Sequence, residues 1–413
     1  MTRVAYVIGS FPMRSETFVY REVMGLRERG VDVDVFCVSR PTRAQAGNAL
    51  EATRGLHVEY ISRLAALGAL ARHTPRRVLE FNSQLQSCAT LKSKKWLRLG
   101  RALAIASRVA RGGYERIHSH WPYGHQLAAL AHLITDVPSS ISVHAHEVAH
   151  DNGHFASVFE LVDFATFCND AARRYLLQAF PQISSQKCHL VYHGVNLAEF
   201  PALALPPAGA SLRVVSAGRL TSTKGFPRLL RVVALLGQQG VPVELTIVGD
   251  GSQREALLSL AAELGISARV NITGWVEPAQ LRRAFEGSDV FCLLADTTFH
   301  DGLPNVVLEA QALGRPVVLS TLPAAPEAVS DGVEGYVVAP DDVAGACRAL
   351  TRLAREPALR EQFARAGRAR VERQHDASYH LGQLQRLFIN RASAAASIGA
   401  APGVDVPLVA GPR

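Results

Sequence analysis

The sequence alternates expected strands and helices in two separate runs, and this repeated alternation limits the folds that the chain can adopt. The second run is the more regular: strand 213–216, helix 225–236, strand 243–248, helix 255–264, strand 270–272, helix 278–286, strand 290–294, helix 305–313 and strand 316–320. Short apolar strands that alternate with amphipathic helices build a parallel sheet with helices on both faces. This half is therefore predicted to be an α/β, doubly wound domain.

The first run begins in the same way. A strand over 4–8, a glycine-bearing loop over 9–15, a helix over 17–30 and a strand over 32–38 follow one another. Further strands over 116–119 and 140–143 each run into a loop that contains two histidines, His118 and His120 or His144 and His146. Because ligands bind at the carboxyl ends of parallel strands, we expect a second Rossmann-like domain whose histidine loops line a site.

A segment poor in charge separates the two runs. Residues 197–211 are rich in Ala, Leu and Pro, which is typical of a linker. A chain of 413 residues is long enough for two domains, and we assign 1–196 to the first and 212–374 to the second. A separate helical segment is expected over 375–392. Ala, Gly and Pro dominate 393–413, which is expected to be a flexible tail.

Cysteine usage and hydropathy bear on the compartment. The six cysteines form no C-x-x-C pair, so reduced thiols in a cytoplasmic protein are expected. The first apolar run is too short for a signal peptide, and no uncharged stretch is long enough to cross a bilayer. We therefore expect a cytoplasmic protein that is at most peripheral to the inner face of a membrane.

Positive charge is concentrated in residues 72–116, which contain eleven Lys and Arg against two Glu. Within this segment, apolar and basic residues recur on different faces of an expected helix. One interpretation is a solvated surface helix. Another is a patch that contacts anionic lipid head groups through Lys94, Lys95, Arg98 and Arg101, each contributing on the order of 1 kcal/mol. A nucleic-acid surface ranks lowest, because the sequence has no zinc finger or RNA-recognition signature.

Two cations of the second half point to a diphosphate. Arg219 follows an expected strand, and Lys224 directly precedes an expected helix, whose first backbone amides favour anions. Charge-assisted contacts of this kind contribute roughly 1.5 to 3 kcal/mol each. The alternative interpretation is a pair of ordinary surface cations.

Two acids of the second half flank the start of another expected helix. Asp301 lies in the loop before this helix, and Glu309 lies two turns along it, so both carboxylates can face one ligand. Alone, two acids at this spacing are more often solvated helix residues than a site.

The ordered set of motifs resembles the family-4 retaining glycosyltransferases of the two-domain GT-B fold. Across about residues 3 to 390, it is similar to bacterial enzymes of exopolysaccharide assembly of the colanic-acid type. The motifs are Ser15-Glu16-Thr17-Phe18, Ser142-Val143-His144-Ala145-His146, His193-Gly194-Val195, Gly218-Arg219-Leu220 with Lys224-Gly225, Val248-Gly249-Asp250-Gly251 and Asp301 to Glu309-Ala310.

This resemblance implies roles for individual residues on the donor side. Arg219 and Lys224 would hold the donor diphosphate, and Glu309 would bind the ribose hydroxyls. Asp301 would contact the transferred sugar, and His144 would lie beside that sugar as a second catalytic residue. Backbone groups of the segment after Asp301 would contact phosphate or sugar; they belong to Gly302, Leu303, Asn305 and Val306.

The resemblance also extends to the acceptor side and to the end of the chain. The first domain is the acceptor side, with Gly9, Ser15, Glu16 and Thr17 as candidates, and the helix in 375–392 would return to it. Three positions depart from the family pattern. Asp301 is shorter than the usual Glu, Pro304 lacks an N–H, and Asn196 replaces an Asp that we place in the hinge.

Two short motifs suggest metals. His146-Glu147-Val148-Ala149-His150 matches the H-E-x-x-H motif of zinc hydrolases, although a strand before it and Asn152-Gly153 after it leave little room for a helix. Asp32-Val33-Asp34 lies within an alternating strand, where the acids are expected on its polar face. We assign no metal and no cofactor, because Arg219 and Lys224 can neutralise the leaving diphosphate.

The expected reaction is transfer of a hexose from a UDP- or GDP-sugar to a hydroxyl of a glycan that is lipid-linked, in cell-surface polysaccharide biosynthesis. Retention follows from the resemblance. Double displacement needs a carboxylate nucleophile about 5 Å from an acid, and no residue is marked as that nucleophile, which favours departure and attack on the same face. A GT-B sugar-nucleotide epimerase stays open as an alternative, as does the zinc hydrolase.

Overall fold

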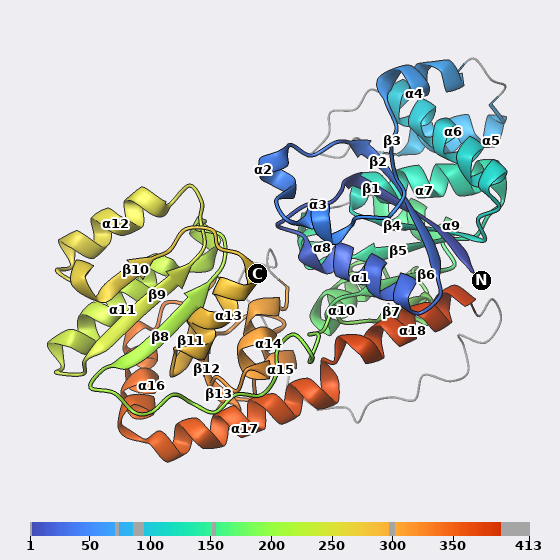
Figure 1. Ribbon diagram of the computed structural model, residues 1–413. Helices are drawn as coiled ribbons and strands as arrows, with labels where there is room; N and C mark the ends of the chain where they lie inside the picture. Colours follow the sequence, from blue (N-terminus) through green and yellow to red (C-terminus); the bar gives the residue numbers. More distant parts are fainter. Residues whose placement is uncertain (1, 71–73, 86–94, 151–153, 297–301, 390–413) are drawn as a thin grey trace.

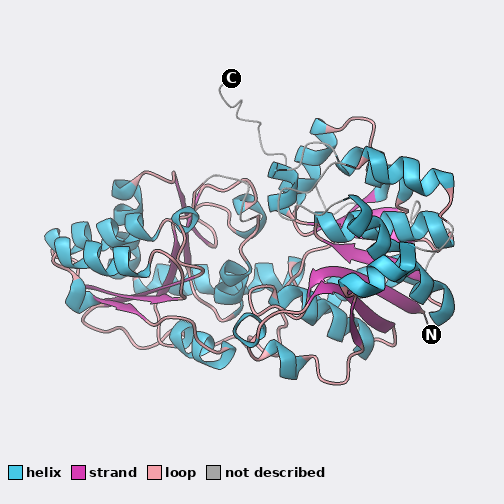
Figure 2. Ribbon diagram, turned by 90° about the horizontal axis from the view of Figure 1, so that it is seen from above, coloured by secondary structure: helices cyan, strands magenta, loops and turns pink. Residues whose placement is uncertain are grey.

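The computed structural model describes residues 2–70, 74–85, 95–150, 154–296 and 302–389. They form two α/β domains that lie beside each other, each with a central sheet and flanking helices (Figure 1, Figure 2). This is the predicted pair of doubly wound, Rossmann-like domains. Within these ranges, no helix has both the length and the apolar character needed to cross a bilayer.

The N-terminal sheet is parallel throughout, with the strand order β3-β2-β1-β4-β5-β6-β7. Its strands are β1 (Arg3–Ser10), β2 (Asp32–Ser39), β3 (Val58–Tyr60), β4 (Arg116–His120), β5 (Ser139–Val143), β6 (Phe164–Phe167) and β7 (Cys188–Leu190). Along β1, Tyr6 and Ile8 face one hydrophobic core, and Val7 faces the other. Burial on both faces explains why this strand is apolar at nearly every position.

The C-terminal sheet repeats the design with the order β10-β9-β8-β11-β12-β13. Its strands are β8 (Leu212–Ala217), β9 (Val243–Val248), β10 (Val270–Ile272), β11 (Val290–Leu293), β12 (Val317–Ser320) and β13 (Gly335–Val338). In the middle of the sheet, Val214 of β8 pairs with Leu245 of β9 and Val290 of β11. The five strands predicted for this half all occur, with ends shifted by at most one residue; β13 was not predicted.

Helices cover both sheets. Those of the N-terminal domain are α1 (Thr17–Glu28), α2 (Arg43–Ala46), α3 (Ala49–Ala52), α4 (Arg63–Leu70), α5 (Arg76–Gln84), α6 (Lys95–Gly112), α7 (Pro122–Thr135), α8 (Ala145–His150), α9 (His154–Leu161), α10 (Asp170–Ala179) and the 3₁₀ turn η1 (Ser185–Lys187). Those of the C-terminal domain are η2 (Ser222–Lys224), α11 (Phe226–Gln238), α12 (Arg254–Glu263), η3 (Ser267–Arg269), α13 (Pro278–Glu286), α14 (Asn305–Ala312), α15 (Ala325–Ala328), α16 (Val343–Arg355) and α17 (Pro357–Gln374).

The chain crosses between the domains twice, and the two crossings are hydrogen-bonded to each other. The Val195 N–H donates to the His375 carbonyl oxygen over 2.8 Å, and the Ala377 N–H donates to the Val195 carbonyl oxygen over 3.0 Å. Beyond the second crossing, α18 (Ala377–Ile389) lies along α1, and its Leu384 and Phe388 join the N-terminal core (Figure 1). The last described helix is therefore part of the N-terminal domain by its packing.

Candidate functional site

The two domains meet where strands of both sheets end. Gly302, just before α14, lies against the ends of β5 and β6, since a β-carbon added to it would be 3.0 Å from Ala145 Cβ and 2.9 Å from Asn169 Nδ2. His144 directly precedes Ala145, so the loop that enters α14 faces the histidine loop across the cleft. Asp301 lies outside the described residues, and its predicted sugar contact remains a prediction.

His144 is held among aromatic rings and polar groups at the end of β5. Its ring stacks on Trp121 at 4.1 Å between centroids, and its Nε2 lies 3.1 Å from Nδ1 of His120. Burial, followed by the neighbouring His120, lowers the pKa of His144 well below its usual value. The imidazole is therefore neutral at neutral pH and can form hydrogen bonds without carrying charge.

The four predicted acceptor-side residues lie between β1 and the start of α1. Glu16 precedes α1, and its Oε2 accepts a hydrogen bond from Trp121 Nε1 over 3.1 Å. Burial raises the pKa of Glu16, and the hydrogen bond from Trp121, then His120 and last Arg219 of the opposite domain counteract this rise. Gly9 has no atom within 4 Å of an added β-carbon, Ser15 is exposed, and Thr17 begins the helix half-buried.

The structure places the two predicted diphosphate cations on one loop after β8. Arg219 is exposed, and Lys224 is half-buried, with its aliphatic stem against Gly218. Lys224 ends η2 and is separated only by Gly225 from the first residue of α11. Lys224 thus lies beside a helix N-terminus, which favours anions, and Arg219 lies on the loop that leads to it.

Glu309 is already paired in this structure. It lies on α14, only 7 % exposed, and its Oε1 is 3.3 Å from Arg21 Nη1 of α1. Burial raises the pKa of Glu309, and Arg21 counteracts this rise. Arg21 also contacts Glu199 of the linker over 3.5 Å, so it bridges three segments at the mouth of the cleft.

The other predicted donor contacts lie at the start of the same helix. Asn305 is the first residue of α14, and Leu303, Asn305 and Val306 are half-buried. Pro304 is the N-cap residue and has no side-chain cap. The first amides of a helix have no partner within the helix, so the contacts predicted for these residues with the donor stay a prediction.

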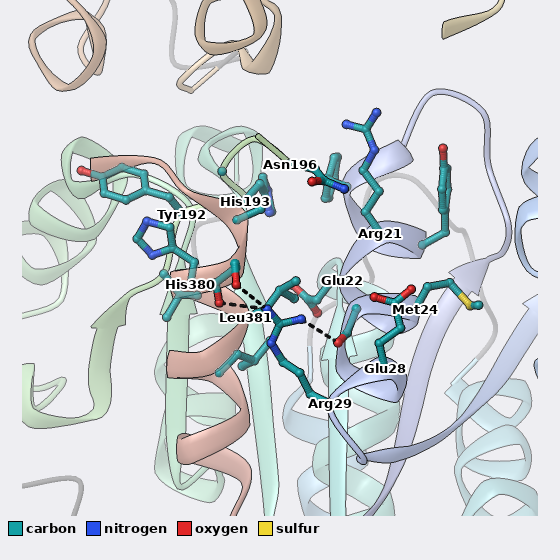
Figure 3. Close-up of a pocket in the computed structure, with 18 of the residues that line it drawn as sticks. Arg21, Glu22, Met24, Glu28, Arg29, Tyr192, His193, Asn196, His380 and Leu381 are labelled. Carbon is teal, nitrogen blue, oxygen red and sulfur yellow. Dashed lines mark hydrogen bonds between the residues drawn. The ribbon is translucent and has the colours of Figure 1, made fainter. Parts of the chain in front are cut away.

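A cavity of about 430 Å³ extends from the cleft between α1, α18 and the hinge segment 191–199. Figure 3 shows Arg21 and Arg29 on the α1 wall and His380 and Leu381 on the α18 wall. Arg29 is bound to α18, since its Nη2 donates to the Ser378 hydroxyl over 2.7 Å. Asn305 also lines this cavity, which links it to the start of α14.

Four basic residues of this segment were predicted to contact lipid, and this prediction is wrong for two of them, Arg98 and Arg101. Arg98 is fully buried, with its guanidinium donating to Asn82 and Gln126, and Arg101 is 8 % exposed and donates to Tyr123. These contacts hold both guanidinium groups inside the domain, so neither side chain is exposed enough to contact a membrane surface. Lys95 is exposed, with its Nζ 3.3 Å from the Ser83 carbonyl oxygen, and Lys94 lies outside the described residues.

The H-E-x-x-H segment forms the short helix α8, which is only 6 residues long, in line with the expectation of little helix. Glu147 points into the protein, where its Oε1 accepts from the His144 N–H and its Oε2 lies 3.0 Å from His125 Nε2. Burial raises the pKa of Glu147 to about 8. A zinc hydrolase needs this carboxylate beside a metal-bound water, so its burial here argues against that alternative; the His150 side chain is not described.

The D-x-D segment and two clusters of His, Cys and Glu side chains have the residue types of metal ligands. Asp34 is 6 % exposed and binds Arg3 and Tyr114, so it does not lie on a polar face as predicted for the D-x-D segment. Among described side chains, two groups come close enough to share an ion: His144 with Cys168 and His193, and Glu22 with His118 and His120. The second group is already hydrogen-bonded within the protein, and we assign a metal to neither.

Sequence reasoning missed Arg21 and Glu22, which enter the site from α1. Both lie on a helix whose motif residues precede them, and no local pattern marks them. His120 was noted only as part of a strand-end loop. Their importance comes from contacts to residues about 100 and 290 positions away, which a local pattern does not encode.

Comparison with known domain families assigns both halves of the chain. Residues 15–199 match the domain family described as Glycosyltransferase Family 4, and residues 205–370 match the one described as Glycosyl transferases group 1. The two matched ranges correspond to the two structural domains.

Individual relatives show where the similarity lies. The lipopolysaccharide core biosynthesis glycosyltransferase LpsE of Rhizobium meliloti is 37% identical over 162 residues, which are 39% of this chain and 44% of LpsE. WcaL of Salmonella typhimurium, named for a role in colanic acid biosynthesis, is 25% identical over 378 residues, 86% of this chain and 91% of WcaL. Among solved structures, HepE of Anabaena in complex with UDP matches with a TM-score of 0.75 at 16% identity, over 94% of this chain and 100% of HepE.

Proposed function

This chain is a family-4 glycosyltransferase of the GT-B fold, and we propose that it transfers a hexose from a UDP- or GDP-sugar, with retention, to a hydroxyl of a growing lipid-linked glycan. The observation that carries the proposal is the meeting of three features at one cleft. The cations Arg219 and Lys224 lie on the loop between β8 and α11, Glu309 lies on α14, and neutral His144 lies on the opposite domain.

Each group has a place in the proposed reaction. Arg219 and Lys224 stabilise the negative charge that builds on the leaving diphosphate, so that the chain does not require a divalent ion there. Glu309 accepts hydrogen bonds from the ribose, and Asp301 and His144 position the hexose. The leaving phosphate oxygen takes the proton of the attacking acceptor hydroxyl on the same face of the sugar.

Relatives support the class of substrate. HepE has been solved with UDP-glucose bound, and amylovoran and lipopolysaccharide core biosynthesis appear in the names of AmsK of Erwinia amylovora and LpsE. A glycan of cell-surface polysaccharide biosynthesis is therefore the proposed acceptor for this chain too. Its assembly on a lipid carrier would place the enzyme at the cytoplasmic face of a membrane.

The test is acceptor-dependent release of the nucleoside diphosphate. A thermal-shift screen against UDP-, GDP- and ADP-sugars first selects the donor, because a ligand stabilises the fold it binds by mass action. Release that rises with added glycan acceptor and persists in EDTA supports a metal-independent transferase. Conversion of the donor without acceptor supports the epimerase alternative instead, and stabilisation by none of the three donors contradicts the proposal.

We further propose that α4 and α6 contact anionic lipid through exposed apolar residues beside Lys95, the one residue of the predicted patch that the structure shows to be exposed. The two helices pack together at one end of the N-terminal domain (Figure 1). Leu64, Leu67 and Trp96 are 81 %, 58 % and 65 % exposed, with Arg63 and Lys95 adjacent. Trp96→Ser with Leu67→Ser should reduce sedimentation with phosphatidylserine vesicles, whereas Leu258→Ser on exposed α12 should not; equal sedimentation of all forms contradicts the proposal.

A further inference from the structure

Three polar side chains from different elements form a continuous chain behind His144. Glu22 comes from α1, His120 is the last residue of β4, and His144 follows β5. His120 Nε2 lies 3.0 Å from Glu22 Oε1, and His120 Nδ1 lies 3.1 Å from His144 Nε2. His120 is fully buried and His144 is 5 % exposed, so water does not compete for these contacts.

The carboxylate end of this chain is fixed. Tyr6 donates its hydroxyl hydrogen to the same Glu22 Oε1 over 2.8 Å. Burial acts to raise the pKa of Glu22, but His120 and the other nearby histidines overcome it and bring the pKa to about 2. Glu22 is thus a hydrogen-bond acceptor only, and its Oε1 accepts a hydrogen bond from the Nε2–H of His120.

The direction of the hydrogen bonds then follows from His120. A His120 ring that carries a single proton, directed from Nε2 to Glu22, has a lone pair on Nδ1, and this lone pair accepts the Nε2–H of neutral His144. This leaves a lone pair on Nδ1 of His144. No described residue bonds that nitrogen.

Neighbouring side chains hold the His144 ring in the orientation that places its Nε2 against His120. Trp121 stacks on the His144 ring at 4.1 Å with 27° between planes, and His193 stacks near it at 5.5 Å with 26°. His118 approaches Glu22 to 3.9 Å, but its two nitrogens bond the hydroxyls of Ser140 and Ser142, each over 2.9 Å. His118 therefore does not displace His120 from the carboxylate.

We propose that Glu22 and His120 are positioning residues that fix the ring plane and the tautomer of His144, so that Nδ1 is offered to the transferred sugar as a hydrogen-bond acceptor. The proposal rests on the proposed function, because it assumes that a sugar binds beside His144. A hydroxyl of that sugar donates to Nδ1, and the neutral histidine adds no charge to the site. Glu22 and His120 themselves do not contact substrate.

The tautomer is measured first on the unmodified protein. Nitrogen-15 chemical shifts of the His144 ring at neutral pH should show a proton on Nε2 and none on Nδ1. This measurement needs no substrate, so it is independent of whether the proposed reaction is right. A His144 ring protonated on Nδ1, or one that exchanges freely between tautomers, would overturn the proposal.

Variants of Glu22 then separate positioning from folding. Glu22→Gln keeps an oxygen that accepts from Tyr6 and His120, whereas Glu22→Leu has similar size and no acceptor. Glu22→Leu should mix the His144 tautomers and lower kcat on the order of tenfold to a hundredfold, with donor KM changed by less than about threefold. Glu22→Gln should restore the tautomer and most of kcat.

The pattern of losses decides the outcome. Equal loss of kcat in both variants with an unchanged His144 tautomer contradicts a positioning role. A Glu22→Leu protein that fails to fold leaves the tautomer of the unmodified protein and of Glu22→Gln as the deciding measurements. Absence of acceptor-dependent release in the unmodified enzyme, with the tautomer as expected, would instead refute the proposed function.

Discussion

Arg21 of the N-terminal domain and Glu309 of the C-terminal domain form an ion pair across the cleft, with 3.3 Å between Nη1 and Oε1. The carboxylate that we assign to the donor ribose is therefore occupied by a protein cation before a donor binds. A ribose and Arg21 have to share or exchange this acceptor. Donor binding and the contact between the domains are then coupled at one residue.

This pair gives different predictions for its two members. Glu309→Gln should raise the donor KM roughly tenfold, since about 1.4 kcal/mol of ribose binding is lost. Arg21→Met removes the competing cation and should leave the donor KM unchanged or lower it. Donor KM in steady-state kinetics is the measurement. A similar rise in both variants would show that Arg21 itself binds the donor.

Glu147 predicts a pH dependence of stability. Its pKa is about 8 in the folded protein, raised from 4.5 by burial. The folded state then holds a proton that the unfolded state loses, so stability falls as pH rises from about 4.5 to about 8, by up to about 1.4 kcal/mol per pH unit. Glu147→Gln imitates the neutral acid and should flatten this part of the Tm against pH curve.

The same variant tests the zinc alternative. Glu147→Gln keeps an acceptor for the His144 N–H and a donor for His125, so transferase activity at pH 7 should stay near that of the unmodified enzyme. Glu147→Ala, which leaves both partners unsatisfied in the interior, should lower Tm strongly. If the curves of Tm against pH were parallel for Glu147→Gln and the unmodified protein, this result would contradict the assignment of Glu147 as a buried neutral acid.

The fold was largely predictable because its signals are local. Strands such as β11 and β12 are buried on both faces and consist of short apolar runs, and the helices of this half carry amphipathic patterns. The duplicated alternation therefore predicted two sheets. The last strand, β13, was missed because Gly335 and half-buried residues make its apolar run weak.

The site was less predictable because its contacts are long-range. The amphipathic pattern of α6 placed Arg98 on a solvated face, but Asn82 and Gln126 on two other helices make a buried place for its charge. Likewise, nothing near Glu22 in the sequence indicates that it meets His120. Motif order located the cations and Glu309, whereas their partners depended on tertiary structure.

Lys224 provides a test of the diphosphate assignment. Lys224→Ala should lower kcat/KM roughly tenfold to a hundredfold, because a charge-assisted contact to phosphate contributes about 1.5 to 3 kcal/mol. Tm without ligand should change little, since the side chain is half-buried on a loop. Arg231→Ala, which removes an exposed cation of α11, is the matched control and should leave kcat/KM unchanged. Equal activity of the two variants would remove Lys224 from the site.

Two glycines give opposite predictions and test whether the loop geometry matters for function. At Gly225, φ is +67° and an added β-carbon would lie 1.7 Å from the Leu294 carbonyl oxygen, so Gly225→Ala should displace the start of α11. A loss of roughly 2 to 4 kcal/mol of stability and weaker donor binding are expected.

Gly9 has open space around an added β-carbon, so Gly9→Ala should leave Tm and donor KM unchanged. If the acceptor approaches this loop as proposed, the same variant should raise acceptor KM alone; an unchanged acceptor KM would place the acceptor away from Gly9.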